Sequence, residues 1–474
     1  DLSDIGDYDL ALNARKQGSG IDLGCFEHDA SQVQCGIVWS PQASVAAGTT
    51  VTSKATGIDA LNPTSWRWTV TDPSGVSTVY ETKDVSFAPS LIGAYTVALH
   101  VTTAGGERDF TEDLEALTVL PKEVFVSLDG SSEEPYASWK TATTNIHDAL
   151  RFATLGTTVY VDEGLFAVTN EIELADKITV CGVGRMSEVV LRRTDAVSHR
   201  IFHLNHLDAV VTNLTLTNGR IDNDELGNYG KGGGVMIDAG TLTDCLVVSN
   251  YNGGFYGSGC GIALQGAQGK VIRCAICHNK AASGYPYAGG IYMTAGTVEN
   301  CLIYSNSCQD AGGVYVEGTG EGLIRNCTVV CNRAGNPPGG SNMTCGLWLA
   351  NPNVAVENTI VRDNVHTVHQ GTDKEQEWSD FHFGDKQSTK VSEAQVKNCC
   401  LSVTCGSGCV TDDPCFRSGW RIWAKSPCRD KGLPTLNDWA RGTVDLDGKP
   451  RLVGYGVDMG CFENQSGGLQ VIVR

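Results

Sequence analysis

Apolar and polar residues alternate with a period of two between residues 31 and 121. The alternating segments are TSWRWTVTD, VSTVYET, GAYTVALHVTTAGG and EALTVLP, and Gly, Pro, Asp and Asn residues separate them. This pattern is typical of strands that bury one face and expose the other. We therefore predict an antiparallel β-sandwich over residues 30–121, in which Trp66 and Trp68 lie on one aromatic core face.

The pattern changes after residue 122. A strand-like segment, EVFVSLDG, is followed by Ile146, Leu150 and Ala153, whose spacings of four and three residues predict a helix. The segments TTVYVDEGLF and KITVCGVG then begin a series of short predicted strands. An open end of stacked strands would pair with other chains, so we expect the helix to cover the first coil of this series.

The middle of the chain repeats itself. Five segments step from small residues into an apolar strand: GGGVMI, GCGIAL, GGIYM, GGVYV and CGLWL. Four continue to a second strand with a cysteine at a fixed place, and a fifth, VENTIVRDN, has Thr359 there. The four cysteines are 29, 27 and 26 residues apart, which is the length of one solenoid coil.

Equivalent residues of stacked coils lie about 4.8 Å apart, so they form columns through the core. We expect a column of small, buried cysteines and a column of asparagines whose amides bond to one another at a bend. The predicted columns contain Cys245, Cys274, Cys301, Cys327, Asn250, Asn279, Asn306 and Asn332, with Asn364 as a further asparagine. The fold class predicted from these patterns is all-β, with a parallel β-helix over residues 122–464 after the sandwich.

The two ends of the chain carry nearly the same motif. YDLALNARKQGSGIDLGCFE, from Tyr8, aligns without a gap with VDLDGKPRLVGYGVDMGCFE, from Val444, and half of the positions are identical. We interpret residues 1–29 as the closing tail of a preceding unit and residues 465–474 as the first strand of a following domain or a linker. The strand at 469–473 is then expected to pair with a sandwich of the next unit.

Composition limits the partners. The net charge is −19 and no basic run of five residues occurs, which argues against nucleic acid and anionic membranes. No apolar run approaches the roughly 20 residues that span a bilayer. Nineteen cysteines, clustered near the end in NCCLSVTCGSGCVTDDPC, suit an oxidising compartment with some disulfides.

Three motifs suggest cofactors or catalysis, and each has a simpler interpretation. CAICH at Cys274–His278 matches covalent haem attachment, but its residues align with ordinary positions of other coils. DLDG at Asp445 begins like a calcium loop and continues like a turn. The longest insertion carries histidines and acids without close metal-ligand spacing, and we expect a solvated loop there: His366, His369, Asp373, Glu375, Glu377, Asp380, His382 and Asp385. We predict neither a metal nor a cofactor.

Aromatic residues gather in the loops between the asparagine column and the next glycine step. If the coils stack in register, these loops emerge along one flank, where ring faces beside polar groups suit sugar binding. The alternative is that the rings cover the solenoid or pack on a neighbouring domain. The candidate carbohydrate-binding residues are Tyr229, Tyr251, Phe255, Tyr256, Tyr285, Tyr287 and Trp378.

Some motifs resemble known families. WRWTVTDPSG and GAYTVALHVT are similar to the polycystic-kidney-disease type of immunoglobulin-like domain. The opening at 123–166 resembles the first turn of right-handed parallel β-helix proteins. VKNCCLS, DDPCF, SPCRDKG and DLDGKPRLVGYGVDMGCFE resemble the closing module of secreted bacterial choice-of-anchor β-helix proteins. This resemblance implies a large protein at a bacterial cell surface and implies no reaction.

Three hypotheses about function remain. The first is an extracellular structural or adhesive unit, repeated head to tail or continuous with neighbouring units, that contacts polysaccharide along one flank. The second is a polysaccharide lyase or glycoside hydrolase, which needs converging carboxylates and a Lys, Arg or calcium ion in a groove. The third is a carbohydrate-binding module without turnover.

Overall fold

The computed structural model describes most of the chain. The described residues are 36–110, 116–194, 197–222, 230–254, 257–281, 287–309, 311–335, 346–366, 380–383 and 392–466. They belong to two compact units, which divide between Lys122 and Glu123, with Ala153–Gly156 grouped with the first. The first copy of the repeated motif and the strand predicted at 469–473 lie outside the described residues.

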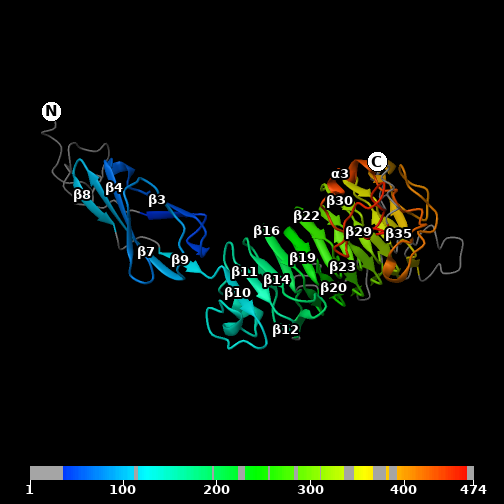
Figure 1. Ribbon diagram of the computed structural model, residues 1–474, viewed down its shortest axis with the longest axis horizontal. Helices are drawn as coiled ribbons and strands as arrows, with labels where there is room; N and C mark the ends of the chain where they lie inside the picture. The colour runs from blue at the N-terminus through cyan, green and yellow to red at the C-terminus, as the bar shows by residue number, and fades with distance from the viewer. Residues whose placement is uncertain are drawn as a thin grey trace, which may run out of the picture. The chain divides into compact units, whose positions relative to one another are not determined.

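The first unit is built from two sheets. A three-stranded antiparallel sheet contains β1 (Gly36–Ser40), β3 (Val51–Thr56) and β6 (Val85–Phe87). The second sheet runs in the order β2 (Ser44–Ala46), β9 (Leu117–Leu120), β7 (Gly93–Thr103), β4 (Ser65–Thr71) and β5 (Ser77–Tyr80), with β8 (Gly106–Phe110) paired to β7. A single turn, η2 (Asp59–Leu61), precedes β4. Figure 1 shows these strands in blue and cyan.

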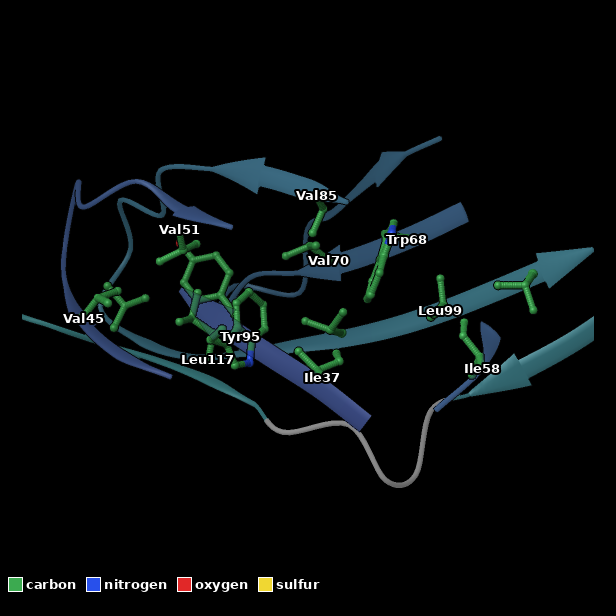
Figure 2. Close-up of a cluster of buried hydrophobic side chains, with 14 residues drawn as sticks. Ile37, Val45, Val51, Ile58, Trp68, Val70, Val85, Tyr95, Leu99 and Leu117 are labelled. Carbon is green, nitrogen blue, oxygen red and sulfur yellow. The ribbon is translucent and has the colours of Figure 1, made fainter. Parts of the chain in front are cut away.

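Trp68 lies at the centre of the sandwich core. Its side chain is fully buried, and its indole N–H donates to the carbonyl of Thr82 at 3.1 Å. Figure 2 shows Trp68 and Val70 on β4 beside Leu99 and Val85. Trp66 is only partly buried against the same core. The alternating pattern therefore places one tryptophan inside the core and leaves the other at its edge.

The second unit is a solenoid whose coils build three parallel sheets, the shortest of which begins only at β18 (Arg220–Ile221). We call them the long, middle and short sheets. The long sheet contains β10 (Glu123–Val126), β11 (Thr158–Val161), β13 (Ile172–Leu174), β14 (Thr179–Gly182), β16 (Phe202–Thr212), β19 (Val235–Thr243), β22 (Ile262–Ile272), β25 (Ile291–Met293), β26 (Gly296–Glu299), β29 (Val314–Val316), β30 (Gly322–Arg325), β33 (Leu347–Leu349), β34 (Val354–Glu357), β37 (Phe381–Phe383) and β38 (Val396–Lys397).

The other two sheets have one short strand per coil. The middle sheet contains β12 (Gly164–Val168), β15 (Val189–Arg193), β17 (Thr215–Thr217), β20 (Leu246–Val248), β23 (Ala275–Cys277), β27 (Leu302–Tyr304), β31 (Thr328–Val330) and β35 (Ile360–Arg362). The short sheet contains the two-residue strands β18 (Arg220–Ile221), β21 (Tyr251–Asn252), β24 (Lys280–Ala281), β28 (Ser307–Cys308), β32 (Arg333–Ala334) and β36 (Val365–His366). The protein is therefore all-β, and this unit is a right-handed parallel β-helix.

Left-handed residues form two corners in each coil. One corner precedes the cysteine column and the other precedes the asparagine column. Asn is tolerated there because its short side chain can bond to nearby backbone. The first corner contains Asn213, Asp244, Arg273, Asn300, Asn326, Asn358 and Asn398, with φ between 48° and 57°. The second contains Asn218, Ser249, His278, Ser305, Cys331 and Asp363, with φ between 54° and 61°.

The helix expected at the start of the solenoid is present but shorter. α1 (Ile146–Leu150) packs against β10, β11 and β12, and it buries Ile146 completely. The side chain of Asn145 caps it by accepting the backbone N–H of His147 at 3.0 Å. Ala153, which was expected to extend the helix, lies beyond its end. A turn, η3 (Trp139–Thr141), precedes it.

The four column cysteines are fully buried and occupy equivalent positions in successive coils. The backbone N–H of Cys274 reaches the sulfur of Cys301 at 3.5 Å. In the coil that follows Cys327, Thr359 fills the position of the column cysteine. Its hydroxyl accepts the backbone N–H of Cys327 at 3.4 Å. A hydroxyl and a thiol therefore serve the column equally, as small side chains that accept one backbone N–H.

The sixteen cysteines in the described part of the chain form no disulfide with one another. The expected disulfides are therefore not formed among them, because most of these cysteines fill the narrow solenoid interior as small apolar residues. Three further pairs have their thiols in contact: Cys260 with Cys308, Cys399 with Cys409, and Cys400 with Cys428.

The buried asparagines form a continuous hydrogen-bond ladder. The Oδ1 atom of Asn306 accepts the backbone N–H of Asn279 at 3.1 Å and its side-chain Nδ2–H at 2.9 Å. The Nδ2 atom of Asn306 donates to the carbonyl of Ile276 at 2.9 Å and to Asn332 Oδ1 at 3.0 Å. The same pattern links Asn250 to Asn279, Asn306 to Asn332, and Asn332 to Asn364. Each amide is thereby satisfied inside the protein.

The closing module packs against the last three strands of the middle sheet, β27, β31 and β35. It contains η4 (Glu393–Gln395), η5 (Ser418–Trp420), η6 (Pro434–Leu436) and α3 (Asn437–Ala440). Cys461 and Phe462 pack against the outward apolar residues Leu302 and Val330. The backbone N–H of Cys461 also donates to the hydroxyl of Thr328 at 3.1 Å. The module is therefore anchored to coils that precede it by more than one turn.

Candidate functional site

Five of the six outward residues of the short sheet form a row that includes three cations, and the sixth, Val365, continues it with an apolar side chain. In each two-residue strand the first side chain faces outward and the second faces the core, as the alternation of strands requires. The first residues are in register from coil to coil. We call this row the cationic stripe; it contains Arg220, Tyr251, Lys280, Ser307 and Arg333.

Arg220 and Tyr251 form one end of the stripe. The guanidinium of Arg220 lies 4.8 Å from the centre of the Tyr251 ring. Arg220 also donates to both carboxylate oxygens of Asp222, at 2.8 and 3.2 Å. These hydrogen bonds raise the pKa of the Arg220 guanidinium above its ordinary value. The charged group is thus held in place over the ring.

A cavity of about 310 Å³ occupies the other end of the stripe. Small side chains leave room for it, since its lining includes Ala281, Cys308 and Gly335. The polar part of the lining is Lys280, Ser307, Gln309 and Arg333. Within the described part of the chain, no carboxylate forms an ion pair with Lys280 or Arg333. The cavity therefore presents two cations, neither paired with an acid that the structure describes, beside a hydroxyl and an amide.

The long sheet carries an outward column of aromatic residues. Tyr292, Tyr315, Trp348 and His382 are in register in successive strands, and Tyr315 lies 5.0 Å from Trp348 between ring centres. Both tyrosine hydroxyls donate to the carboxylate of Glu317, at 2.5 and 3.0 Å. Burial, and then Glu317, raise the pKa of both tyrosines well above the ordinary value. Trp348 is only 1% exposed, so this column is part of a packed cluster.

A charged cluster lies on earlier strands of the same sheet. The imidazole of His203 is 2.8 Å from the carboxylate of Asp238 and 3.6 Å from that of Glu171. The guanidinium of Arg200 lies 3.4 Å from Glu171. Burial lowers the pKa of Arg200, against the opposing effect of Glu171. Acids, a base and a cation therefore converge here, which is the kind of arrangement that general acid–base chemistry requires.

Two of the seven predicted carbohydrate-binding residues are described, and the structure does not bring them together. Tyr251 belongs to the cationic stripe, whereas Tyr287 precedes β25 and stacks on Tyr315 at 5.5 Å. The other five lie outside the described residues: Tyr229, Phe255, Tyr256, Tyr285 and Trp378. Sequence reasoning did not identify Lys280 and Arg333. Their constant offset of one residue from the asparagine column is the signal that locates them.

The CAICH motif is distributed over three environments. Cys274 belongs to the cysteine column, Cys277 is 2% exposed, and His278 adopts the left-handed corner conformation. The His278 ring lies edge-on to Tyr304 at 5.7 Å. These three side chains do not share an open face on which haem could be attached, as covalent attachment would require.

The long insertion contributes only a few described residues. Asp380 ends the asparagine ladder, since its Oδ1 accepts the backbone and side-chain N–H groups of Asn364 at 2.8 and 3.0 Å. His382 packs against Trp348 at 5.5 Å. The acids and histidine between residues 367 and 379, and Asp385, lie outside the described residues. Across the residues with assigned structure, no cluster of three or more His, Cys, Asp or Glu side chains could hold a metal ion.

The closing motif encloses a buried network of charges. Asp445, Arg451, Asp458 and Glu463 are at most 4% exposed. Asp445 accepts the backbone N–H groups of Asp447 and Lys449, both at 2.9 Å, so DLDG forms a turn. Arg451 donates to the carbonyls of Asp458 and Gly460, and Glu463 accepts the N–H of Asp458 at 3.0 Å. The network therefore ties the segments on either side of Gly456 together.

We expect the stability of the closing module to fall as the pH rises from about 5 to about 9. Burial, and then the carboxylate of Asp458, raise the pKa of Glu463 to about 9, and burial raises that of Asp458 to about 6. The unfolded chain loses these protons first, near pH 4–5, so each further pH unit favours unfolding by at most about 1.4 kcal/mol per group. Urea unfolding followed at several pH values measures this slope. Glu463→Gln should flatten it above pH 6, and an unchanged slope in this variant would contradict the assignment.

A comparison with known protein families agrees with the fold. Residues 254–415 match a family model described as a right-handed beta helix region. A solved structure, the pectate lyase Pel9A, aligns over 72% of this chain and 96% of its own, with 14% identity and a TM-score of 0.38. Curated proteins give no match. Among the described residues, no helix is long and apolar enough to cross a membrane.

Proposed function

We propose that this right-handed parallel β-helix protein is an extracellular structural or adhesive unit of a larger bacterial surface or fibre protein. In this proposal the solenoid is a stiff scaffold that contacts polysaccharide through its cationic stripe. The asparagine ladder supports the first part, because it joins five coils by satisfied, buried hydrogen bonds. The near-copy of the closing motif at residues 8–27 supports head-to-tail neighbours of the same kind.

The observation that carries the glycan contact is the stripe itself. An aromatic ring with a fixed cation, a cavity lined by a hydroxyl and an amide, and the two cations Lys280 and Arg333 lie in one row. Sugars are held by ring stacking on their apolar faces and by polar contacts to their hydroxyls. The stripe offers both kinds of contact on a rigid sheet, which lowers the ordering cost of binding.

Tyr251→Ala tests the contact. Loss of one stacking ring should weaken binding of the full chain to a retained polysaccharide by about fivefold, equivalent to about 1 kcal/mol. Affinity electrophoresis through gels that contain single polysaccharides measures this change. Tyr455, which is 95% exposed on the closing module, provides the matched control Tyr455→Ala. Equal retention of both variants and the parent would contradict the proposal.

The second candidate function is a polysaccharide lyase or glycoside hydrolase. The cluster of Glu171, Arg200, His203 and Asp238 favours it, because it combines acids, a base and a cation on the outer face of the long sheet. An assay for cleavage of the bound polysaccharide distinguishes the enzyme from the structural unit. An enzyme would release unsaturated or reducing sugar ends from the polysaccharides that bind, and His203→Ala would abolish that release, whereas a structural unit would bind without releasing products.

A further inference from the structure

The charges on the stripe contrast with those of the whole chain. The protein carries a net charge of −19, yet three of the six outward residues of the short sheet are cationic and none of the six is acidic. The acid beside them, Asp222, is occupied by Arg220 and by the hydroxyl of Ser198. Among the described side chains the stripe is thus net positive, and such a row attracts anions by local contacts and not by net charge.

We propose that the cationic stripe binds an acidic polysaccharide that lies along the solenoid axis, with one acid group at Lys280 and another at Arg333. This inference rests on the proposed glycan contact and adds its chemical class and direction. Lys280 and Arg333 are separated by one intervening strand, so the two residues are about 9.6 Å apart along the axis, at about 4.8 Å per coil. An extended chain of pyranose rings advances by roughly one ring for each coil.

The two cations suit different parts of such a chain. The planar guanidinium of Arg333 can hold a carboxylate through two parallel N–H bonds, and the ammonium of Lys280 acts as a point charge that tolerates several geometries. Neither forms an ion pair with an acid in the described part of the chain. These features favour a carboxylate-bearing sugar over a neutral one.

The cavity between the cations fits a sugar ring. Its volume of about 310 Å³ is at the lower end of the roughly 300–1,000 Å³ found for ligand sites. Ser307 and Gln309 supply a hydroxyl and an amide that can bond to ring hydroxyls, and Ala281 and Gly335 keep the floor low. Beyond the cavity, the Tyr251 ring with its attached Arg220 continues the surface in the same axial direction.

The test uses the full chain with alginate and with the same polymer after its carboxyl groups are reduced to alcohols. We expect alginate to bind and the reduced polymer to bind at least tenfold more weakly. Lys280→Gln and Arg333→Gln should each weaken alginate binding about fivefold or more and reduce its salt dependence, because each removes one ionic contact. Lys270→Gln, which removes an exposed lysine from the long sheet, should leave binding unchanged.

Oligomers of alginate test the direction. A chain that bridges Lys280 and Arg333 should gain affinity steeply once it is about three sugars long, and Arg333→Gln should remove that gain. Equal binding of a single sugar and a trimer would overturn the axial arrangement.

The outcomes separate this inference from the proposed function. If alginate and its reduced form bind equally and Tyr251→Ala weakens both, the glycan contact stands and the acidic class is wrong. Unchanged alginate binding by both Lys280→Gln and Arg333→Gln would also overturn the acidic class. If neither polymer nor any neutral polysaccharide is retained, both the inference and the proposed function fail.

Discussion

Replacing Asn306 by alanine is expected to lower the free energy of unfolding of the solenoid by about 3–4 kcal/mol. The change removes the acceptor for two N–H groups of Asn279 and the donor to the carbonyl of Ile276. These groups are buried, and each orphaned group costs about 1–3 kcal/mol, with partial relaxation reducing the sum. Urea unfolding monitored by far-ultraviolet circular dichroism measures the loss.

Two further variants test whether the ladder is the cause. Asn306→Asp should be as damaging as alanine, because a carboxylate cannot donate to Ile276 and faces the Oδ1 atom of Asn332. Asp380 ends the ladder and has no donor role toward a following coil, so Asp380→Asn should cost far less. Asn205 is exposed, and Asn205→Ala controls for the loss of an asparagine. A loss below about 0.5 kcal/mol in Asn306→Ala would contradict the ladder's role.

Replacing Arg451 by methionine is expected to lower the stability of the closing module by about 3–5 kcal/mol, as for other buried charges that lose their partner. The guanidinium is fully buried and lies among Asp458, Glu463 and two backbone carbonyls. Methionine keeps much of the volume but leaves the carbonyls of Asp458 and Gly460 without donors.

The measurement is again urea unfolding, combined with limited proteolysis that detects release of the closing module. Arg441, in the same module, pairs with Asp438 at 3.5 Å while both side chains are largely exposed, so Arg441→Met is the matched control. We expect that control to change stability by less than about 0.5 kcal/mol. Equal effects of the two substitutions would show that burial of Arg451 is not what the module needs.

The architecture could be predicted because columns leave a periodic record in the sequence. The spacing of Cys245, Cys274, Cys301 and Cys327 gave the coil length, and the glycine steps gave the start of each strand. Alternation in WRWTVTD likewise indicated the sandwich strand that buries Trp68. Such patterns encode which residues repeat, and stacking then fixes what lies above each residue.

The candidate site was harder to predict, because a surface depends on pairs of residues far apart in the sequence. Lys280 and Arg333 look like ordinary exposed cations until the register places them two coils apart in one row. Tyr251 and Tyr287 occur in equivalent-looking loops, yet one belongs to the short sheet and the other packs on Tyr315. Only their offsets distinguish these destinations, because Tyr251 directly follows Asn250 whereas Tyr287 lies eight residues after Asn279.

The motif repeated near both ends of the chain shows a similar limit of prediction from the sequence. The repeated motif preserves the counterparts of all four charged residues of the buried network, as Asp9, Arg15, Asp22 and Glu27. In the sequence DLDG begins like a calcium loop and continues like a turn, and no pattern there places the four charges together. Only the fold shows that the charges face one another inside the closing module.

The attachment of the closing module to earlier coils has a mechanical consequence. Cys461 bonds to Thr328, Gly460 bonds to the carbonyl of Asn358, and the Trp439 ring lies 4.3 Å from the guanidinium of Arg325. A force that pulls on the end of this unit must therefore shear several coils together before it can peel the last one. In a fibre made of such units, the closing modules would therefore resist unfolding when the fibre is stretched.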